Sequence, residues 1–160
     1  HTRCADVTGV QTCALPICMP AVGMSDIANL YAAVKFYRVC KEAGVKPIFG
    51  VELAMHAGGD GGEGGPIILL CKDNTGFRRV SELLTSLYTR PRQGESLSLT
   101  IEQLKPLAAH VMIIAGFESP IGKLARAGHL EDATDLARQF GHAFKDGFFL
   151  ELSQIGRAHV

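Results

Sequence analysis

The chain has 160 residues, of which 47% are hydrophobic and 20% are charged, so it is long enough to bury an apolar core. Sixteen basic residues balance sixteen acidic residues, and this balance argues against a domain that binds nucleic acid by itself. No apolar run approaches the roughly 20 residues of a membrane-spanning helix, so we expect no membrane partner.

The two ends of the chain resemble translated sequencing-adapter DNA. Codons for Thr12–Ile17 can be chosen so that their reverse complement, read one base further on, encodes Ile155–Val160. Natural termini have no reason to be antisense to each other, and the broken apolar pattern near the N-terminus does not fit a secretory leader. We therefore expect residues 1–17 and 154–160 to be non-native, and residues 18–153 to be the biological segment.

Cysteine usage in that segment indicates a reducing compartment. Cys40 and Cys71 lie securely inside it, and they form neither a disulfide framework nor a paired-cysteine zinc signature. We interpret both as small core residues of a cytoplasmic protein.

The first predicted elements are a strand and a helix. Residues 20–24 form an apolar run that predicts a buried strand, after which Ser25 or Asp26 offers a helix N-cap. Gly44 is expected to end this helix as a C-cap glycine. The apolar residues at helical spacing are Ile27, Leu30, Val34, Tyr37 and Cys40.

Two further strands are predicted at 46–55 and 66–71, on either side of a glycine-rich surface loop at 58–65. A helix with one apolar side then opens at Asn74 or Thr75.

A polar linker at 90–96 leads into the second half of the chain. The remaining predicted elements are a short helix from Thr100, a strand at 111–116, a helix that starts at Ser119–Pro120, a helix at 130–144 and a strand at 148–152. Strands that alternate with amphipathic helices predict an α/β fold with a parallel sheet. This pattern does not separate a barrel from an open doubly wound sheet.

Two neighbouring segments resemble a known family. Residues 25–37 read S-D-I-A-N-L-Y-A-A-V-K-F-Y and are similar to its motif T-D-H-G-N-L-x-G-A-V-x-F-Y. Residues 41–52 are similar to its K-x-A-G-I-K-P-I-x-G-x-E, at the same spacing. These are motifs of the PHP domain of bacterial DNA polymerase III alpha subunits. The resemblance implies a partial PHP-type irregular β/α barrel, with parallel strands that alternate with helices.

The resemblance also implies where metal ligands would lie. Active PHP domains resemble phosphoesterases with several metal ions at the carboxyl ends of barrel strands, held by His, Cys and carboxylate side chains. The family's ligand positions fall on Ile27, Glu52, Pro66 and Phe117 in this chain, of which only Glu52 could coordinate a cation. We expect no bound metal and no catalytic residue here. Glu52 is either a vestigial ligand or a carboxylate satisfied by neighbouring donors, of which we favour the second, and we expect Phe117 to fill the volume of the ions.

The function implied is that of a fragment of a replicative DNA-directed DNA polymerase, a nucleotidyltransferase. The degenerate metal site favours a metal-free structural or interaction domain, inactive by itself. Magnesium would be held elsewhere in the parent protein, which would bind DNA, deoxynucleotides and other replicase subunits, including a separate proofreading exonuclease. The alternative is an active metal-dependent phosphoesterase or 3′-5′ proofreading exonuclease. A stand-alone α/β metabolic enzyme is a third hypothesis.

Overall fold

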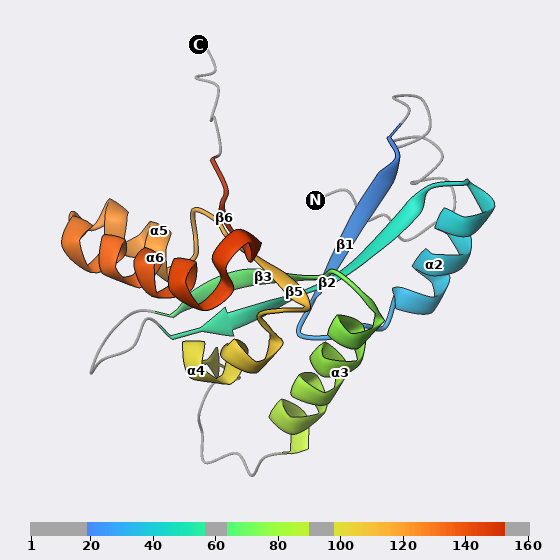
Figure 1. Cartoon of the computed structure of the whole chain (residues 1–160), viewed down its shortest axis with the longest axis horizontal. Helices are drawn as coiled ribbons and strands as arrows, with labels where there is room; N and C mark the ends of the chain where they lie inside the picture. Colours follow the sequence, from blue (N-terminus) through green and yellow to red (C-terminus); the bar gives the residue numbers. More distant parts are fainter. Residues whose placement is uncertain (1–18, 57–63, 90–97, 153–160) are drawn as a thin grey trace, which may run out of the picture.

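The computed structural model describes residues 19–56, 64–89 and 98–152, which form a mixed β-sheet with helices packed on it (Figure 1). The strands are β1 (Ala21–Ile27), β2 (Lys46–Met55), β3 (Gly65–Cys71), β4 (Ser98–Leu99), β5 (Val111–Ala115) and β6 (Phe148–Leu150). The α-helices are α2 (Ala33–Glu42), α3 (Asn74–Thr89), α4 (Ile101–Leu104), α5 (Pro120–Arg126) and α6 (Leu130–Phe144). Single 3₁₀ turns follow α4 at Lys105–Leu107 and α6 at Lys145–Gly147.

The α/β class is confirmed, but the expectation of parallel strands is wrong for β3. The main strand order is β1-β2-β3-β5-β6, with β4 paired to β2. The pairs β1–β2 and β5–β6 are parallel, whereas β3 runs antiparallel to both of its neighbours. The connection between β2 and β3 is too short for a crossover helix, so the chain returns antiparallel.

Burial alternates along the central strands, so the sheet has one covered face. Val51, Leu53 and Met55 of β2 are buried in the main core, together with side chains from α3, α5 and α6. Phe36, Val39 and Cys40 of α2 form a second cluster, which packs against Phe49 of β2 among others. Phe49 and Val51 point to the same side of the strand, so α2 covers this face too.

The opposite face of the sheet is open in the described part of the chain. Its side chains come from the alternate positions of the same strands and are partly exposed; they include Ile48, Glu52, Pro66, Ile68, Leu70, Met112 and Ile114. Such a half-buried apolar face is what the interior of a barrel presents before further strands close it. The sheet is therefore compatible with part of a barrel.

The region between β1 and α2 differs from the prediction. Ser25 and Asp26 do not cap a helix, because β1 continues to Ile27, which pairs with Glu52. The helix begins only at Ala33. Asp26 nevertheless contacts the residue just before this helix, because its Oδ2 accepts a hydrogen bond from the Ala32 N–H at 3.3 Å. The helical spacing of the first apolar residues therefore does not make them a helix, because pairing with β2 holds this segment as a strand.

The buried side of α2 also differs from the prediction. Val34 and Tyr37 were expected on the core side but are 67% and 46% exposed, whereas Phe36 is buried. The C-terminal prediction is confirmed, because Gly44 follows the helix with φ of +69°.

The later elements largely match the predicted ones. Ser119 caps α5 by accepting the Gly122 N–H at 3.2 Å, and a capping box joins Thr100 to Gln103 at α4. Cys40 is fully buried, whereas Cys71 is partly exposed. Most of the glycine-rich loop and the linker at 90–96 lie outside the described residues. In the residues that are described, no helix is both long and apolar enough to cross a membrane.

Candidate functional site

The positions that the resemblance assigned to metal ligands meet, in large part, at one cavity. Ile27 and Glu52 are direct partners at the carboxyl ends of the parallel strands β1 and β2. Pro66 lies next to these two residues, at the start of β3, where it pairs with Ala54. All three side chains line a cavity of about 630 Å³, which we call the strand-end cavity.

The spacing of these three positions suits a shared site. Neighbouring strands lie about 4.8 Å apart, and diagonal partners on one face about 7–8 Å apart. Ile27 is the direct neighbour of Glu52, and Pro66 is diagonal to Glu52 across the β2–β3 pair. The backbone therefore brings the positions together, while two of the three side chains offer no donor atom.

Glu52 is the carboxylate of this set. It is half-buried at the cavity, and its backbone oxygen accepts the Ala28 N–H at 2.8 Å. Among the described residues, no donor forms a hydrogen bond or ion pair with its side chain. The expectation that neighbouring donors satisfy this carboxylate is therefore not met in the described part of the chain.

Phe117 lies apart from the other three positions. It follows β5, is 48% exposed and is not among the residues that line the strand-end cavity. The Arg126 guanidinium covers its ring at 3.9 Å from the ring centre, while Glu118 pairs with Arg126 at 3.2 Å. Phe117 therefore does not line the strand-end cavity with the other three positions, and its ring packs against Arg126 instead. That Phe117 fills the volume of the ions stays a prediction.

Two residues at the strand-end cavity were not predicted from the sequence. His56 follows β2, and Lys123 comes from α5, where its Nζ donates to the Gly64 carbonyl at 2.8 Å. No spacing signal connects Lys123 to Glu52, because only the tertiary fold brings α5 to this end of the sheet. Throughout the described ranges, no three His, Cys, Asp or Glu side chains gather closely enough to hold a metal ion. The described residues that line this cavity therefore do not fit a centre of several ions.

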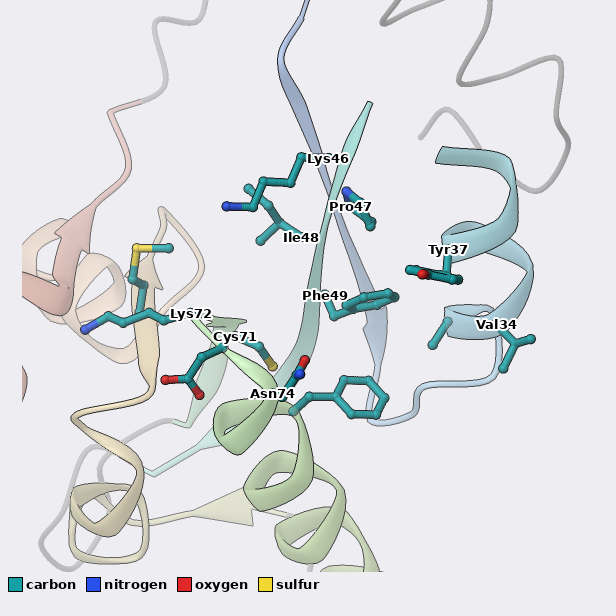
Figure 2. A pocket seen from close by; sticks show the side chains of 13 residues that line it. Val34, Tyr37, Lys46, Pro47, Ile48, Phe49, Cys71, Lys72 and Asn74 are labelled. Atoms are coloured by element: carbon teal, nitrogen blue, oxygen red, sulfur yellow. The ribbon is translucent and has the colours of Figure 1, made fainter. Parts of the chain in front are cut away.

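A second cavity of about 630 Å³, the α2–α3 cavity, lies between α2, the start of β2 and the start of α3. Figure 2 shows Val34 and Tyr37 of α2 on one side of β2, with Lys46 and Ile48 on the other side and Cys71, Lys72 and Asn74 below them. Burial beside Asp73 raises the pKa of the Cys71 thiol to about 11. This thiol is therefore neutral near pH 7 and is a poor nucleophile.

Asp73 and His110 form a polar contact next to this cavity. His110 Nδ1 lies 2.8 Å from Asp73 Oδ2, and Asp73 Oδ1 accepts the Gly76 N–H at 2.8 Å at the start of α3. The hydrogen bond with His110, followed by that with Gly76, lowers the pKa of the Asp73 carboxyl. This contact fastens the start of α3 to the segment before β5.

The comparisons with known proteins agree with this picture. The family model of the PHP domain matches residues 14–154. The chain is similar to the DNA polymerase III subunit alpha of Xylella fastidiosa, with 27% identity over 158 residues, or 98% of this chain and 13% of that protein. The same subunit of Vibrio cholerae is 29% identical over 88% of this chain and 12% of the relative, and that of Pasteurella multocida is 31% identical over 87% and 12%.

The chain thus spans about an eighth of the length of these relatives. The family model covers far more than half of the chain, and the α/β sheet with its strand-end cavity is consistent with that match. This chain belongs to the PHP domain family.

Proposed function

We propose that this chain is part of a replicative DNA polymerase III alpha subunit, in which its PHP domain is a metal-free structural and interaction domain. The observation that carries the proposal is the chemistry of the strand-end cavity. Ile27 and Pro66 present only carbon where the family pattern calls for imidazole, and Glu52 is the single ligand-type side chain of the three.

One carboxylate gives a weak basis for hydrolysis. Water activation by zinc or a similar ion requires several protein ligands that hold the ion and leave one position open. Glu52 and His56 are the ligand-type residues among those lining the cavity, and Lys123 adds a cation there. A positive charge near the cavity disfavours a divalent ion further.

The activity of the parent protein is part of the same proposal. The curated relatives are DNA polymerase III alpha subunits that are about eight times longer than this chain. DNA-templated DNA synthesis, its magnesium ions and its contacts with DNA and deoxynucleotides would belong to the remainder of such a protein. Other replicase subunits, including a separate proofreading exonuclease, are the proposed protein partners.

A phosphoesterase assay tests this proposal against its alternative. The purified chain, freed of metal and then supplied with zinc or manganese, should show no hydrolysis of a phosphodiester or of a 3′-ended oligonucleotide above a buffer blank. Hydrolysis that depends on added metal and is lost in Glu52→Gln would contradict the proposal. That result would establish the metal-dependent phosphoesterase or proofreading exonuclease instead.

A further inference from the structure

The open face of the sheet is a continuous apolar surface in the described part of the chain. The strand register places alternate residues of β1, β2, β3, β5 and β6 on this face. Figure 2 shows Lys46 and Ile48 on it, on the side of β2 away from Tyr37. Its partly exposed apolar side chains include Ile48, Ile68, Leu70, Met112 and Ile114. An apolar surface that spans several strands is typical of an interaction site.

Two charged side chains of opposite sign mark the ends of β2 on this face. Lys46 is exposed at the start of the strand, and Glu52 is half-buried near its end. Within the described ranges, neither side chain takes part in a hydrogen bond or ion pair. Six residues of strand separate them by about 20 Å, so they do not reach each other within one copy of the chain.

The open side of β2 matches itself when the strand is reversed. Lys46 and Glu52 are equally far from Phe49, and so are Ile48 and Gly50 between them. A second β2, stacked antiparallel on the first and centred at Phe49, therefore places Lys46 opposite Glu52 and Ile48 opposite Gly50. Opposite charges meet at both ends, and a large side chain meets a small residue in the middle.

The neighbouring strand β1 has the same self-matching order. Its residues Ala21 and Ile27 pair with the two ends of β2, at Lys46 and Glu52. The reversal that matches β2 therefore also places Ile27 of one copy opposite Ala21 of the other. Ile27 is 72% exposed, so this contact would cover one of the most exposed apolar side chains of the sheet.

We propose that the open face binds a second copy of this chain. The two sheets stack face to face, and the two-fold axis crosses β2 at Phe49, perpendicular to the strands. Such a contact is isologous, because each pair of facing residues occurs twice, and it closes at two copies. The proposal concerns this face alone and does not depend on whether the strand-end cavity holds a metal.

The dimensions of stacked sheets suit these contacts. Sheets pack about 10 Å apart, a gap that a lysine and a glutamate side chain span together. The Leu70 side chain lies over Gly50, since a Cβ there would be 2.6 Å from Leu70 Cδ2. Ile48 of one copy therefore packs on Leu70 of the other. Met112 pairs with Leu70 and continues this apolar contact beside the axis.

The size of the face sets the expected affinity. The strands of the main path, at about 4.8 Å spacing and about 20 Å length, give a footprint of roughly 400 Å² per copy. This footprint is at the small end of specific interfaces. We therefore expect a dissociation constant on the order of 10 μM rather than 1 nM.

Sedimentation equilibrium of the 160-residue chain measures the association. We expect a monomer–dimer equilibrium between about 1 and 200 μM, with no larger species. A chain that stays monomeric at about 200 μM would overturn the proposal, because the face is then covered within one copy or left to another partner. Open-ended growth beyond the dimer would also overturn it, because an isologous contact closes at two copies.

A charge swap tests the facing pair. Lys46→Glu alone and Glu52→Lys alone each place like charges opposite each other at both ends of the dimer, and each should weaken it about tenfold or more. The combined variant should restore the original dissociation constant to within about threefold. Because the two positions are too far apart to touch within one copy, restoration requires a contact between copies.

Lys41→Glu is the control for net charge, since Lys41 is exposed on α2, away from the open face. It should leave the dissociation constant unchanged. Equal weakening by Lys41→Glu and Lys46→Glu would show a general charge effect and overturn the proposal. A combined swap that folds, as judged by circular dichroism, but does not restore the dimer would overturn it too.

The apolar centre has its own matched pair. Ile48→Ser should weaken the dimer about tenfold or more, because it removes an apolar contact on both sides of the axis. Val34→Ser also replaces an apolar side chain, one that is 67% exposed on α2, and should leave the dimer unchanged. The opposite result would place the contact on α2 and refute the proposed surface.

Discussion

At the scale of single residues, donor atoms decide what the strand-end cavity can do. Ile27, Glu52 and Pro66 line one cavity at backbone positions that suit a shared site. The alkyl side chains of Ile27 and Pro66 have no lone pair for a cation. Under the proposed function, these positions mark a metal site whose ligands are absent.

Restoring donor atoms is therefore expected to restore binding. The double substitution Ile27→His and Pro66→His would give two imidazoles beside the Glu52 carboxylate, a ligand set that holds zinc in metalloenzymes. We expect saturable zinc binding by calorimetry that the original chain does not show.

The matched control adds Glu52→Gln to the same two histidines and should weaken zinc binding by about tenfold or more. If the two histidines gain no zinc affinity, the backbone at this cavity does not have the spacing that we infer.

Asp73 predicts a dependence of stability on pH. Its pKa is lowered below the ordinary value of 3.8 in the folded chain, chiefly by the hydrogen bond with His110. The carboxylate therefore stabilises the fold above pH 3.8, and this contribution is lost as the pH falls through the lower pKa of the folded state.

Urea unfolding of the original chain and of Asp73→Asn measures this contribution. The original chain should be the more stable at about pH 6, and the difference should shrink at about pH 3, because the carboxylate becomes protonated. A difference that stays constant between these pH values would show that Asp73 contributes through its shape rather than its charge.

At the scale of elements, local signals predicted some boundaries and missed others. The C-cap glycine Gly44 and the helix starts at Ser119 and Thr100 were recognisable, because these signals depend on neighbouring residues in the chain. The extent of β1 was not recognisable, because Ile27 continues the strand through its pairing with Glu52 on another element. The antiparallel course of β3 likewise depends on the tertiary fold.

The candidate site was likewise predicted in part, and the rest of it depends on the tertiary fold. The resemblance identified Ile27, Glu52 and Pro66, and the structure brings these three together. It did not identify Lys123, whose place depends on how α5 packs, and the fourth position, Phe117, lies outside this cavity against Arg126. The α2–α3 cavity escaped prediction because Val34 and Tyr37 match the apolar spacing of a core-facing helix side.

Gly44 provides a prediction at this scale. Its φ of +69° is costly for any residue with a Cβ, although no atom lies within 4 Å of where that Cβ would be. Gly44→Ala should therefore destabilise the chain by about 1 kcal/mol through the backbone alone, measured by chemical unfolding.

Gly141→Ala is the matched control. Gly141 lies within α6, and a Cβ there also meets no atom within 4 Å. The same substitution should stabilise the fold by up to about 1 kcal/mol, because alanine favours a helix. Equal effects at the two positions would contradict the role assigned to the left-handed turn.

At the scale of the whole molecule, the sheet has one covered face and one open face. Helices and the main core cover the first, whereas Ile48, Ile68 and Ile114 are partly exposed on the second, where no described element packs. An apolar face without cover adds little to stability and exposes surface that favours association.

The 160-residue chain is therefore expected to unfold at a low temperature with a broad transition. Circular dichroism should give a midpoint below about 45 °C, the lower end of the usual range for mesophilic domains. A sharp, two-state transition above about 65 °C would show that the open face does not weaken the fold.

We propose that the strand-end cavity holds no catalytic metal in the polymerase to which this segment would belong. The most direct measurement is anomalous diffraction from crystals of the full-length protein soaked in manganese and in zinc. We expect no anomalous peak beside Glu52, Ile27 and Pro66, while manganese in the polymerase site is the internal positive control. Well-occupied peaks coordinated at Glu52 would contradict it.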